Sequence, residues 1–329
     1  MNKIKLGIIG TGHLGRFHTK LAKEINNCEL IGIFDINPEQ AKKISDEFEV
    51  KAFGSKEELF EQVDAVSIVA TTSAHYDLVK EALNLNKHVL VEKPITSTIE
   101  QGEEIVELAK EKGLKLQVGH IERFNPALLS LEKYNLEPKF IQTDRLAQFN
   151  PRGTDVAVVL DLMIHDIDII LSLIKSEVKT VSASGVPVVS DNIDIANARL
   201  EFENGAVANV TASRISQKKM RKMRMFQRDS YLSMDFDTGA SEVFRLVGQD
   251  ESMPEHFINF GEMGIGDNKK TIVYEQPDQF EINALKHELQ LFVDAIQNDK
   301  EPVVTGEDGL RALKIADVII SKIKEQQVH

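Results

Sequence analysis

The feature that most constrains the fold is a glycine-rich stretch close to the start of the chain. An apolar run, Ile4–Ile9, leads into Gly10-Thr11-Gly12-His13-Leu14-Gly15, which is followed by a helical pattern and a second apolar run. This order predicts a βαβ unit. Gly10 would make the tight turn, Gly12 would let backbone N–H groups approach a pyrophosphate, and Gly15 would let the helix pack closely on the strand. The phosphates would lie at the helix N-terminus, where unpaired N–H groups and the helix dipole favour anions.

An acidic residue closes the second apolar run. Asp35 follows Gly15 by twenty residues, the position from which a carboxylate accepts hydrogen bonds from an adenosine ribose. A carboxylate there would repel a 2′-phosphate, and no arginine directly follows it, so the pattern favours NAD over NADP. The alternative, an ordinary glycine-rich turn with a surface aspartate, is open at this point.

Strand and helix patterns alternate through the first 120 residues, which is typical of an α/β domain with a doubly wound parallel sheet, the Rossmann arrangement. After Asp35 the expected elements are a helix 37–48, a short strand 50–53, a helix 56–62, a strand 64–70, a helix opening at His75, a strand 88–92, a helix 98–112 and a strand 114–118.

Polar side chains follow two of these strands at their carboxyl ends, where open α/β sheets bind ligands. Thr71, Thr72 and His75 are expected to face the cofactor, as are Glu92 and Lys93. The ammonium group of Lys93 could also hydrogen-bond a substrate oxygen. The alternative for this lysine is a surface ion pair with Glu92.

Beyond Gly119 the alternation stops. One helix and several long strand-like stretches follow, which predicts an α+β domain with a mostly antiparallel open sheet. We therefore expect a dinucleotide-binding domain over 1–120 and a substrate and oligomerisation domain over 121–329, whose last helix, about 306–325, could pack back on the first domain. The expected strands are 140–148, 180–189, 195–203, 207–213, 223–235 and 242–247.

A helical pattern over 156–174 carries Asp161, His165 and Asp168 at i, i+4 and i+7. This spacing places all three on one face of an α-helix. A carboxylate one turn before a histidine can orient the imidazole as a general base. Two other interpretations are a core histidine and a divalent metal held by the three side chains.

Composition narrows the possible partners. The net charge of −13 and the pI near 5.3 argue against nucleic acid or an anionic membrane as the general partner. Cys28 is the only cysteine, so no internal disulfide can form, and the start of the chain lacks a signal-peptide pattern. We therefore expect a cytoplasmic protein. An open sheet usually covers its apolar face against a symmetry mate, so we also expect a homo-oligomer, a dimer or tetramer.

With these motifs in hand, the chain resembles the Gfo/Idh/MocA family of NAD(P)-dependent sugar dehydrogenases. The resemblance rests on Gly10–Gly15, Glu92-Lys93-Pro94 and Asp161-x-x-x-His165, and it extends to Arg123-Phe124-Asn125-Pro126 and Val304-Thr305-Gly306-Glu307-Asp308. It implies that Lys93, Asp161 and His165 form the catalytic constellation, that Arg123 and Asn125 lie near the substrate, and that no metal takes part.

Bulky apolar residues replace the commoner glycines before Asp161. Together with the stretch 119–126, they make the chain similar to the branch that oxidises the 3-hydroxyl of UDP-N-acetylglucosamine. A basic run could meet a diphosphate, but a solvated sheet edge kept soluble by cations explains it equally well. The run comprises Lys218, Lys219, Arg221, Lys222 and Arg224.

The resemblance leads us to expect hydride transfer from a sugar-ring carbon to NAD. His165 would take the hydroxyl proton, Lys93 would hold the reacting oxygen and Asp161 would orient His165. One alternative is an inositol or free-sugar dehydrogenase. Another, of a different class, is a catalytically silent NAD-sensing regulatory protein, against which the three intact catalytic candidates argue.

Overall fold

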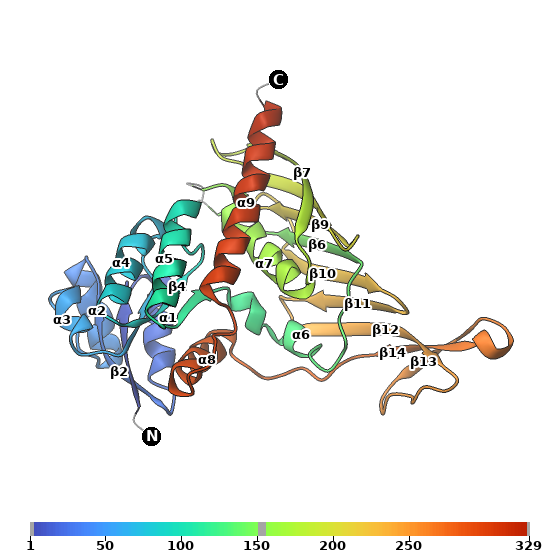
Figure 1. Ribbon diagram of the computed structural model, residues 1–329, viewed down its shortest axis with the longest axis horizontal. Coiled ribbons are helices and arrows are strands. Elements are labelled where there is room, and N and C mark those ends of the chain that lie inside the picture. Colours follow the sequence, from blue (N-terminus) through green and yellow to red (C-terminus); the bar gives the residue numbers. More distant parts are fainter. Residues whose placement is uncertain (1–2, 151–155, 328–329) are drawn as a thin grey trace. The chain divides into compact units, whose positions relative to one another are not determined.

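The computed structural model describes residues 3–150 and 156–327 (Figure 1). Its internal contacts divide the chain into two units, one formed by residues 1–124 and 282–314 and the other by 125–281 and 315–329. The chain therefore returns to the first unit late in the sequence. The helix α8, Ala284–Gln297, belongs to the first unit, and α9, Gly306–Gln327, begins in the first and ends in the second.

The first unit is built on a parallel sheet of five strands in the order β2-β1-β3-β4-β5. This confirms the doubly wound α/β prediction. Helices α1 and α8 pack on the sheet around Leu6, Ile8, Leu289 and Phe292, while α4 contacts β3 and β4 and lies beside α5 (Figure 1). The strands are β1 Ile4–Ile9, β2 Cys28–Phe34, β3 Ala65–Ile68, β4 His88–Glu92 and β5 Leu116–Gly119. The helices before α8 are α1 His13–Ala22, α2 Pro38–Phe48, α3 Lys56–Phe60, α4 Thr72–Asn84, α5 Ile99–Glu111 and the short 3₁₀ turn η1 Ile121–Phe124.

Local side chains set several of these helix starts. The side chains of Asn37, Ser55 and Thr98 each accept a backbone N–H of the turn that follows, and Pro38 occupies the first position of α2. Two details differ from the sequence prediction. The expected strand 50–53 is wrong, because this segment makes a single bridge, Ala52 to Ile33, before it turns into α3. Helix α4 also starts at Thr72, one turn earlier than expected.

The second unit holds a sheet of nine strands in the order β13-β14-β12-β11-β10-β6-β9-β8-β7. The pair β6 and β9 is parallel and every other neighbouring pair is antiparallel, which confirms the predicted mostly antiparallel sheet. Its strands are β6 Phe140–Leu146, β7 Val178–Val186, β8 Ile195–Phe202, β9 Val207–Ser213, β10 Met220–Gln227, β11 Ser230–Asp235, β12 Ala240–Gly248, β13 Ile258–Met263 and β14 Lys270–Glu275. Its helical segments besides the end of α9 are α6 Pro126–Leu129, η2 Val159–Met163, α7 Ile164–Leu173 and η3 Gly266–Asn268.

The single strand expected over 223–235 is wrong. The chain turns back within it to form the hairpin β10–β11, and Asp229 takes a left-handed φ of 61° at the turn. Asn and Asp tolerate this backbone region better than most residues. The sequence prediction also missed β13 and β14, which form a long hairpin extending from the sheet (Figure 1).

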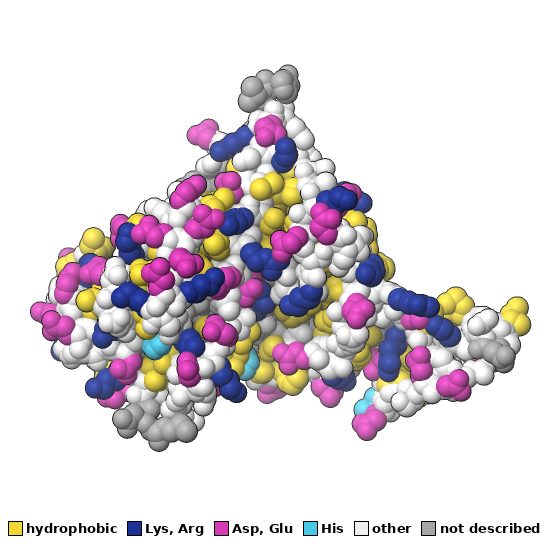
Figure 2. Space-filling model, in the orientation of Figure 1, with side chains coloured by type: hydrophobic (Ala, Val, Ile, Leu, Met, Phe, Trp, Pro, Cys, Tyr) yellow, Lys and Arg dark blue, Asp and Glu magenta, His cyan; other side chains and the backbone are white. Residues whose placement is uncertain are grey.

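One face of this sheet carries a continuous row of aromatic side chains. Neighbouring rings are 4.7 to 5.9 Å apart between centroids, and the row crosses β6, β10, β11, β12, β14 and β13. In β10 the buried Met223 and Met225 face the other way, while Phe226 is 40% exposed. The row consists of Phe140, Phe226, Tyr231, Phe244, Tyr274 and Phe260. Hydrophobic side chains also gather at the outer end of the β13–β14 hairpin (Figure 2).

Candidate active site

The glycine loop after β1 has the geometry that its three glycines predict. Gly10 takes a φ of 90°, and a Cβ there would lie 2.6 Å from the carbonyl oxygen of Val69. A Cβ on Gly15 would lie 2.0 Å from the carbonyl oxygen of Gly10, so any side chain there would push α1 away from the strand. Gly12 has no atom within 4 Å of its Cβ position. The loop therefore packs closely against the protein at Gly10 and Gly15 and leaves space at Gly12, where a pyrophosphate could approach the backbone.

A cavity of about 820 Å³ lies in front of this loop in the first unit. The volume is within the range of small-molecule and cofactor sites. Eight of the residues expected to bind the cofactor line it, namely Gly10, Gly12, His13, Leu14, Asp35, Thr71, Glu92 and Lys93. The sequence prediction missed further lining residues on β2, in the loop after it, and on α3 and α4, namely Phe34, Ile36, Lys56, Ala74, Asp77, Leu78 and Glu81. Thr11, Gly15, Thr72 and His75 are not among the lining residues.

Thr11 acts through Asp35 instead. One carboxylate oxygen of Asp35 accepts the backbone N–H of Thr11 at 2.6 Å and its hydroxyl at 2.9 Å, and the other accepts the backbone N–H of Asn37 at 2.8 Å. A carboxylate has about four acceptor positions. Asp35 is therefore held firmly at the end of β2 and can still accept a hydrogen bond from a ribose hydroxyl.

His75 contacts the backbone rather than the cavity. Its side chain is buried, with Nδ1 2.9 Å from the carbonyl oxygen of Pro94 and Nε2 3.2 Å from that of Ala70. Burial lowers the pKa of His75, although both carbonyl contacts oppose this shift. The ring therefore ties the chain after β3 to the cis Lys93–Pro94 turn that follows β4.

The carboxylate of Glu92 turns inward toward α1. Its Oε1 lies 3.1 Å from Nε2 of His18, and Nδ1 of the same ring lies 2.9 Å from the hydroxyl of Ser67. His18 and Ser67 are fully buried, whereas the Glu92 side chain keeps 13% of its surface exposed. Burial by itself would raise the pKa of Glu92, but the hydrogen bond from His18 and the charge of Lys93 leave it below the ordinary value.

Sequence analysis missed His18. The available signal was its position on the buried face of α1, three residues after Gly15, where a polar side chain needs a partner. Gly119 in β5 is part of the same arrangement, because a Cβ there would lie 3.0 Å from the carboxyl group of Glu92.

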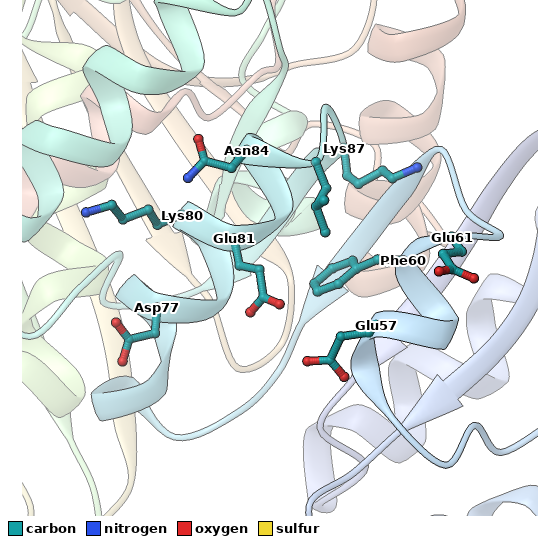
Figure 3. A pocket seen from close by; sticks show the side chains of 9 residues that line it. Glu57, Phe60, Glu61, Asp77, Lys80, Glu81, Asn84 and Lys87 are labelled. Atoms are coloured by element: carbon teal, nitrogen blue, oxygen red, sulfur yellow. The ribbon is translucent and has the colours of Figure 1, made fainter.

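A second cavity of the first unit, about 790 Å³, lies between α3 and α4 (Figure 3). Asp77 and Glu81 line both cavities. Unlike the first cavity, the second is not lined by the glycine loop, whose backbone N–H groups would bind a pyrophosphate. Its two lysines are engaged elsewhere, since Lys80 pairs with Glu104 and Lys87 donates to the carbonyl oxygen of Val63. The cavity in front of the glycine loop is therefore the better cofactor site.

In the second unit, Asp161 lies in a π-helical turn, Val159–Met163, and His165 lies in the first turn of α7. The uninterrupted α-helix expected over 156–174 is therefore wrong at its start, and the i, i+4 spacing does not apply there. π-turns are rare and frequently mark functional positions. Asp161 and His165 are half-buried, whereas Asp168 is 1% exposed and belongs to the core. Among the described residues, no group of three or more His, Cys, Asp or Glu side chains could hold a metal ion.

Two buried ion pairs anchor this helical segment. Arg145 of β6 donates two hydrogen bonds to Asp166, at 2.8 and 3.0 Å, and each side chain is 3% exposed. Before the π-turn, Arg214 donates to the carbonyl oxygen of Val156 and lies 3.6 Å from Asp194. The neighbours of His165 and the start of the segment are thus fixed to the sheet.

Asp194 is itself held by a loop of backbone donors. Its carboxylate accepts the N–H groups of Val188, Val189 and Ser190 at 2.7 to 3.0 Å and the hydroxyl of Ser190 at 2.8 Å. Burial opposes ionisation, but these hydrogen bonds outweigh it and lower the pKa of Asp194 to about 2.

The remaining candidates are in varied surroundings. Arg123 lies 4.0 Å from Asp308, and the amide of Asn125 donates to the carbonyl oxygen of Phe236 and caps α6 at Ala127. The basic run does not lie at a sheet edge, because β10 lies between β6 and β11. Four of its cations pair with acids, namely Lys219 and Arg221 with Asp237, Lys222 with Asp235, and Arg224 with Asp144.

The glycine loop, Asp35 and the cavity define a protein with a dinucleotide-binding unit. The model of the Gfo/Idh/MocA oxidoreductase family with an NAD-binding Rossmann fold matches residues 4–120, and the model of the Gfo/Idh/MocA C-terminal domain matches residues 136–230. The chain belongs to the Gfo/Idh/MocA oxidoreductase family. Its predicted cofactor, NAD, agrees with this family.

Relatives of known activity are similar over nearly the whole chain. The UDP-N-acetylglucosamine 3-dehydrogenase of Acidithiobacillus ferrooxidans is 36% identical over 318 residues, which cover 96% of each chain. A crystal structure of that enzyme has a TM-score of 0.87 at 34% identity and covers 99% of both chains. The myo-inositol 2-dehydrogenase of Thermotoga maritima is 25% identical over 98% of this chain and 97% of its own.

Proposed function

We propose that this chain is an NAD-dependent dehydrogenase that oxidises a ring hydroxyl of a nucleotide sugar, with C3 of UDP-N-acetylglucosamine as the first candidate. One observation carries the proposal. A single cavity joins the glycine loop and Asp35 to Lys93, in a chain that shares 36% of its residues with a UDP-N-acetylglucosamine 3-dehydrogenase. The inositol dehydrogenases are less similar, which favours the nucleotide sugar over the inositol alternative.

Oxidation of a secondary alcohol removes a hydride from carbon and a proton from oxygen. NAD, when bound, accepts the hydride. We propose that His165 takes the proton as the C–H bond breaks and the carbonyl forms, and that Asp161 orients its imidazole. The ammonium group of Lys93 would donate a hydrogen bond to the oxygen and stabilise the negative charge that develops on it.

For substrate binding we propose Arg123 as a contact. Asn125 was expected to contact the substrate directly, but both ends of its amide are bonded within the protein. We propose that it holds the chain entering α6.

We also propose a cytoplasmic homo-oligomer. The aromatic row and β13, whose residues are all exposed, leave apolar surface that a second copy would cover. Lys222 and Arg224 on this face pair with Asp235 and Asp144 of the neighbouring strands, so two such faces would not repel strongly. Light scattering at micromolar concentration should therefore give at least twice the single-chain mass of 36.9 kDa, and a single-chain mass would refute the assembly.

No helix in the described part of the chain is long and apolar enough to cross a membrane.

The activity is tested by measuring NADH formation with UDP-sugars, free sugars and inositols. We expect turnover with UDP-N-acetylglucosamine and little with the free sugars. Oxidation of an inositol alone would replace the proposed substrate class. Tight NAD binding without turnover of any compound would instead favour the NAD-sensing alternative.

A further inference from the structure

Three linked side chains, the buried His18 and Ser67 and the partly buried Glu92, take no part in the proposed proton and hydride transfer. Each of these side chains comes from a different element, namely α1, β3 and the end of β4. Only Glu92 reaches the cavity. Burying a carboxylate beside a ligand site is costly unless a partner compensates it, so this arrangement calls for an explanation.

The strand order indicates which part of the cofactor Glu92 would meet. A dinucleotide lies across the point where the strand order reverses, here between β1 and β3. Asp35 at the end of β2 marks the adenosine side. Glu92 and Lys93, at the end of β4, therefore lie on the nicotinamide side of the same cavity.

The hydrogen bonds show how the carboxylate is held. An ionised Glu92 can only accept, so Nε2 of His18 must be the donor at 3.1 Å. The other ring nitrogen faces a hydroxyl, which can either donate or accept. Ser67 therefore satisfies the histidine whether the ring is neutral or charged, and the carboxylate of Glu92 keeps its donor in both states.

We propose that Glu92, positioned by His18 and Ser67, makes the cavity discriminate between oxidised and reduced cofactor by its charge. The nicotinamide ring carries a positive charge in NAD⁺ and none in NADH. A fixed carboxylate on that side of the cavity attracts the oxidised ring selectively, so it raises the affinity for NAD⁺ relative to NADH. This inference rests on the proposed function, since it takes the cavity to be the cofactor site.

The test compares dissociation constants for NAD⁺, NADH and ADP-ribose, which lacks the nicotinamide. Glu92→Gln keeps the shape of the side chain and removes its charge, and it should shift the NAD⁺/NADH affinity ratio toward NADH by about tenfold. His18→Leu should shift the ratio in the same direction, and His18→Gln, which keeps an N–H donor, should restore most of it. Glu104→Gln is the control, because its carboxylate pairs with Lys80 and does not line this cavity. It should leave the ratio unchanged.

The inference would be overturned if Glu92→Gln weakened the binding of NAD⁺ and NADH by the same factor. It would also be overturned if Glu92→Gln left both affinities unchanged. Either result leaves the proposed function intact as long as the wild type binds ADP-ribose and NAD⁺. If the wild type bound none of the three ligands, the proposed function would be refuted instead. A mere folding defect in His18→Leu would weaken all three ligands alike, so the ratio distinguishes positioning from general damage.

Discussion

Removing one partner of the buried Arg145–Asp166 pair should destabilise the second unit strongly. Both side chains are 3% exposed and are joined by two hydrogen bonds, at 2.8 and 3.0 Å. In Asp166→Asn the amide keeps the volume of the carboxylate, but the buried guanidinium loses the negative charge of Asp166. Such losses cost about 3 to 5 kcal/mol, which corresponds to a drop in Tm of roughly 10 °C for a unit of this size.

Calorimetry is the appropriate assay, because the two units can unfold in separate transitions. Excess NAD should raise the midpoint temperature of the transition that belongs to the first unit. Asp166→Asn should lower the midpoint temperature of the other transition. The kcat should fall, since α7 loses its tie to β6 beside His165, while the affinity for NAD should change little.

Two controls make this result interpretable. Arg145→Met combined with Asp166→Leu removes both charges, and it should recover most of the lost stability because no buried charge is left alone. Glu201→Gln breaks a pair with Arg199 whose side chains are each 44% exposed, and it should cost less than about 1 kcal/mol. If Asp166→Asn melted like the wild type in every transition, the assignment of this pair as a structural anchor would be refuted.

Three further predictions concern the chemistry, the cofactor and the acid response. His165→Ala and Lys93→Ala should each lower kcat by a factor of about 10² to 10⁴ and leave the affinity for NAD nearly unchanged. In steady-state assays the kcat of the double variant should fall by much less than the product of the two single factors. Near-wild-type turnover in His165→Ala would contradict this. Asp35→Ser should narrow the preference for NAD over NADP and should also weaken NAD by roughly tenfold, because Thr11 loses two hydrogen bonds to a charged acceptor; tighter wild-type binding of NADP than of NAD would be the contrary result. The pKa of Asp194 is about 2 in the folded protein against an ordinary 3.8. Its contribution to the free energy of unfolding is therefore complete above about pH 4 and is lost as the pH falls toward 2. Unfolding titrations should show that Asp194→Ala lowers the free energy of unfolding by about 3 kcal/mol at neutral pH and removes this part of its dependence on pH.

Local patterns predicted most of the first unit. The bounds of β4 were predicted correctly, because a buried strand in a parallel sheet is a continuous apolar run between polar turns. The start of α2 was also predictable, since Asn37 and Pro38 fix it within two residues. The cofactor preference followed from the single residue Asp35, whose role depends on its position after β2.

Elements without a buried face were not predictable in this way. All six residues of β13 are exposed, and the alternation of Ile258 and Phe260 with polar residues ends after four positions, which is too short to distinguish a strand from a loop. The turn between β10 and β11 lacks glycine and proline, and the left-handed Asp229 is a weak signal. The π-turn gives no sign in the residue pattern, because it adds one residue to a turn whose side chains other than Asp161 are apolar.

The candidate catalytic residues could be predicted from the sequence, but the side chains that hold them in place could not, because those contacts join residues far apart in the chain. Glu92 and its partner His18 are 74 positions apart, and Asp166 and Arg145 are 21 apart. In each case the anchored acid is the immediate neighbour of a proposed catalytic residue, Lys93 or His165. Fixing a neighbour fixes the backbone that carries the catalytic side chain, and small displacements of such groups are costly to catalysis. Substitutions at these two anchors should therefore impair turnover although neither partner, His18 or Arg145, takes part in the proposed proton or hydride transfer.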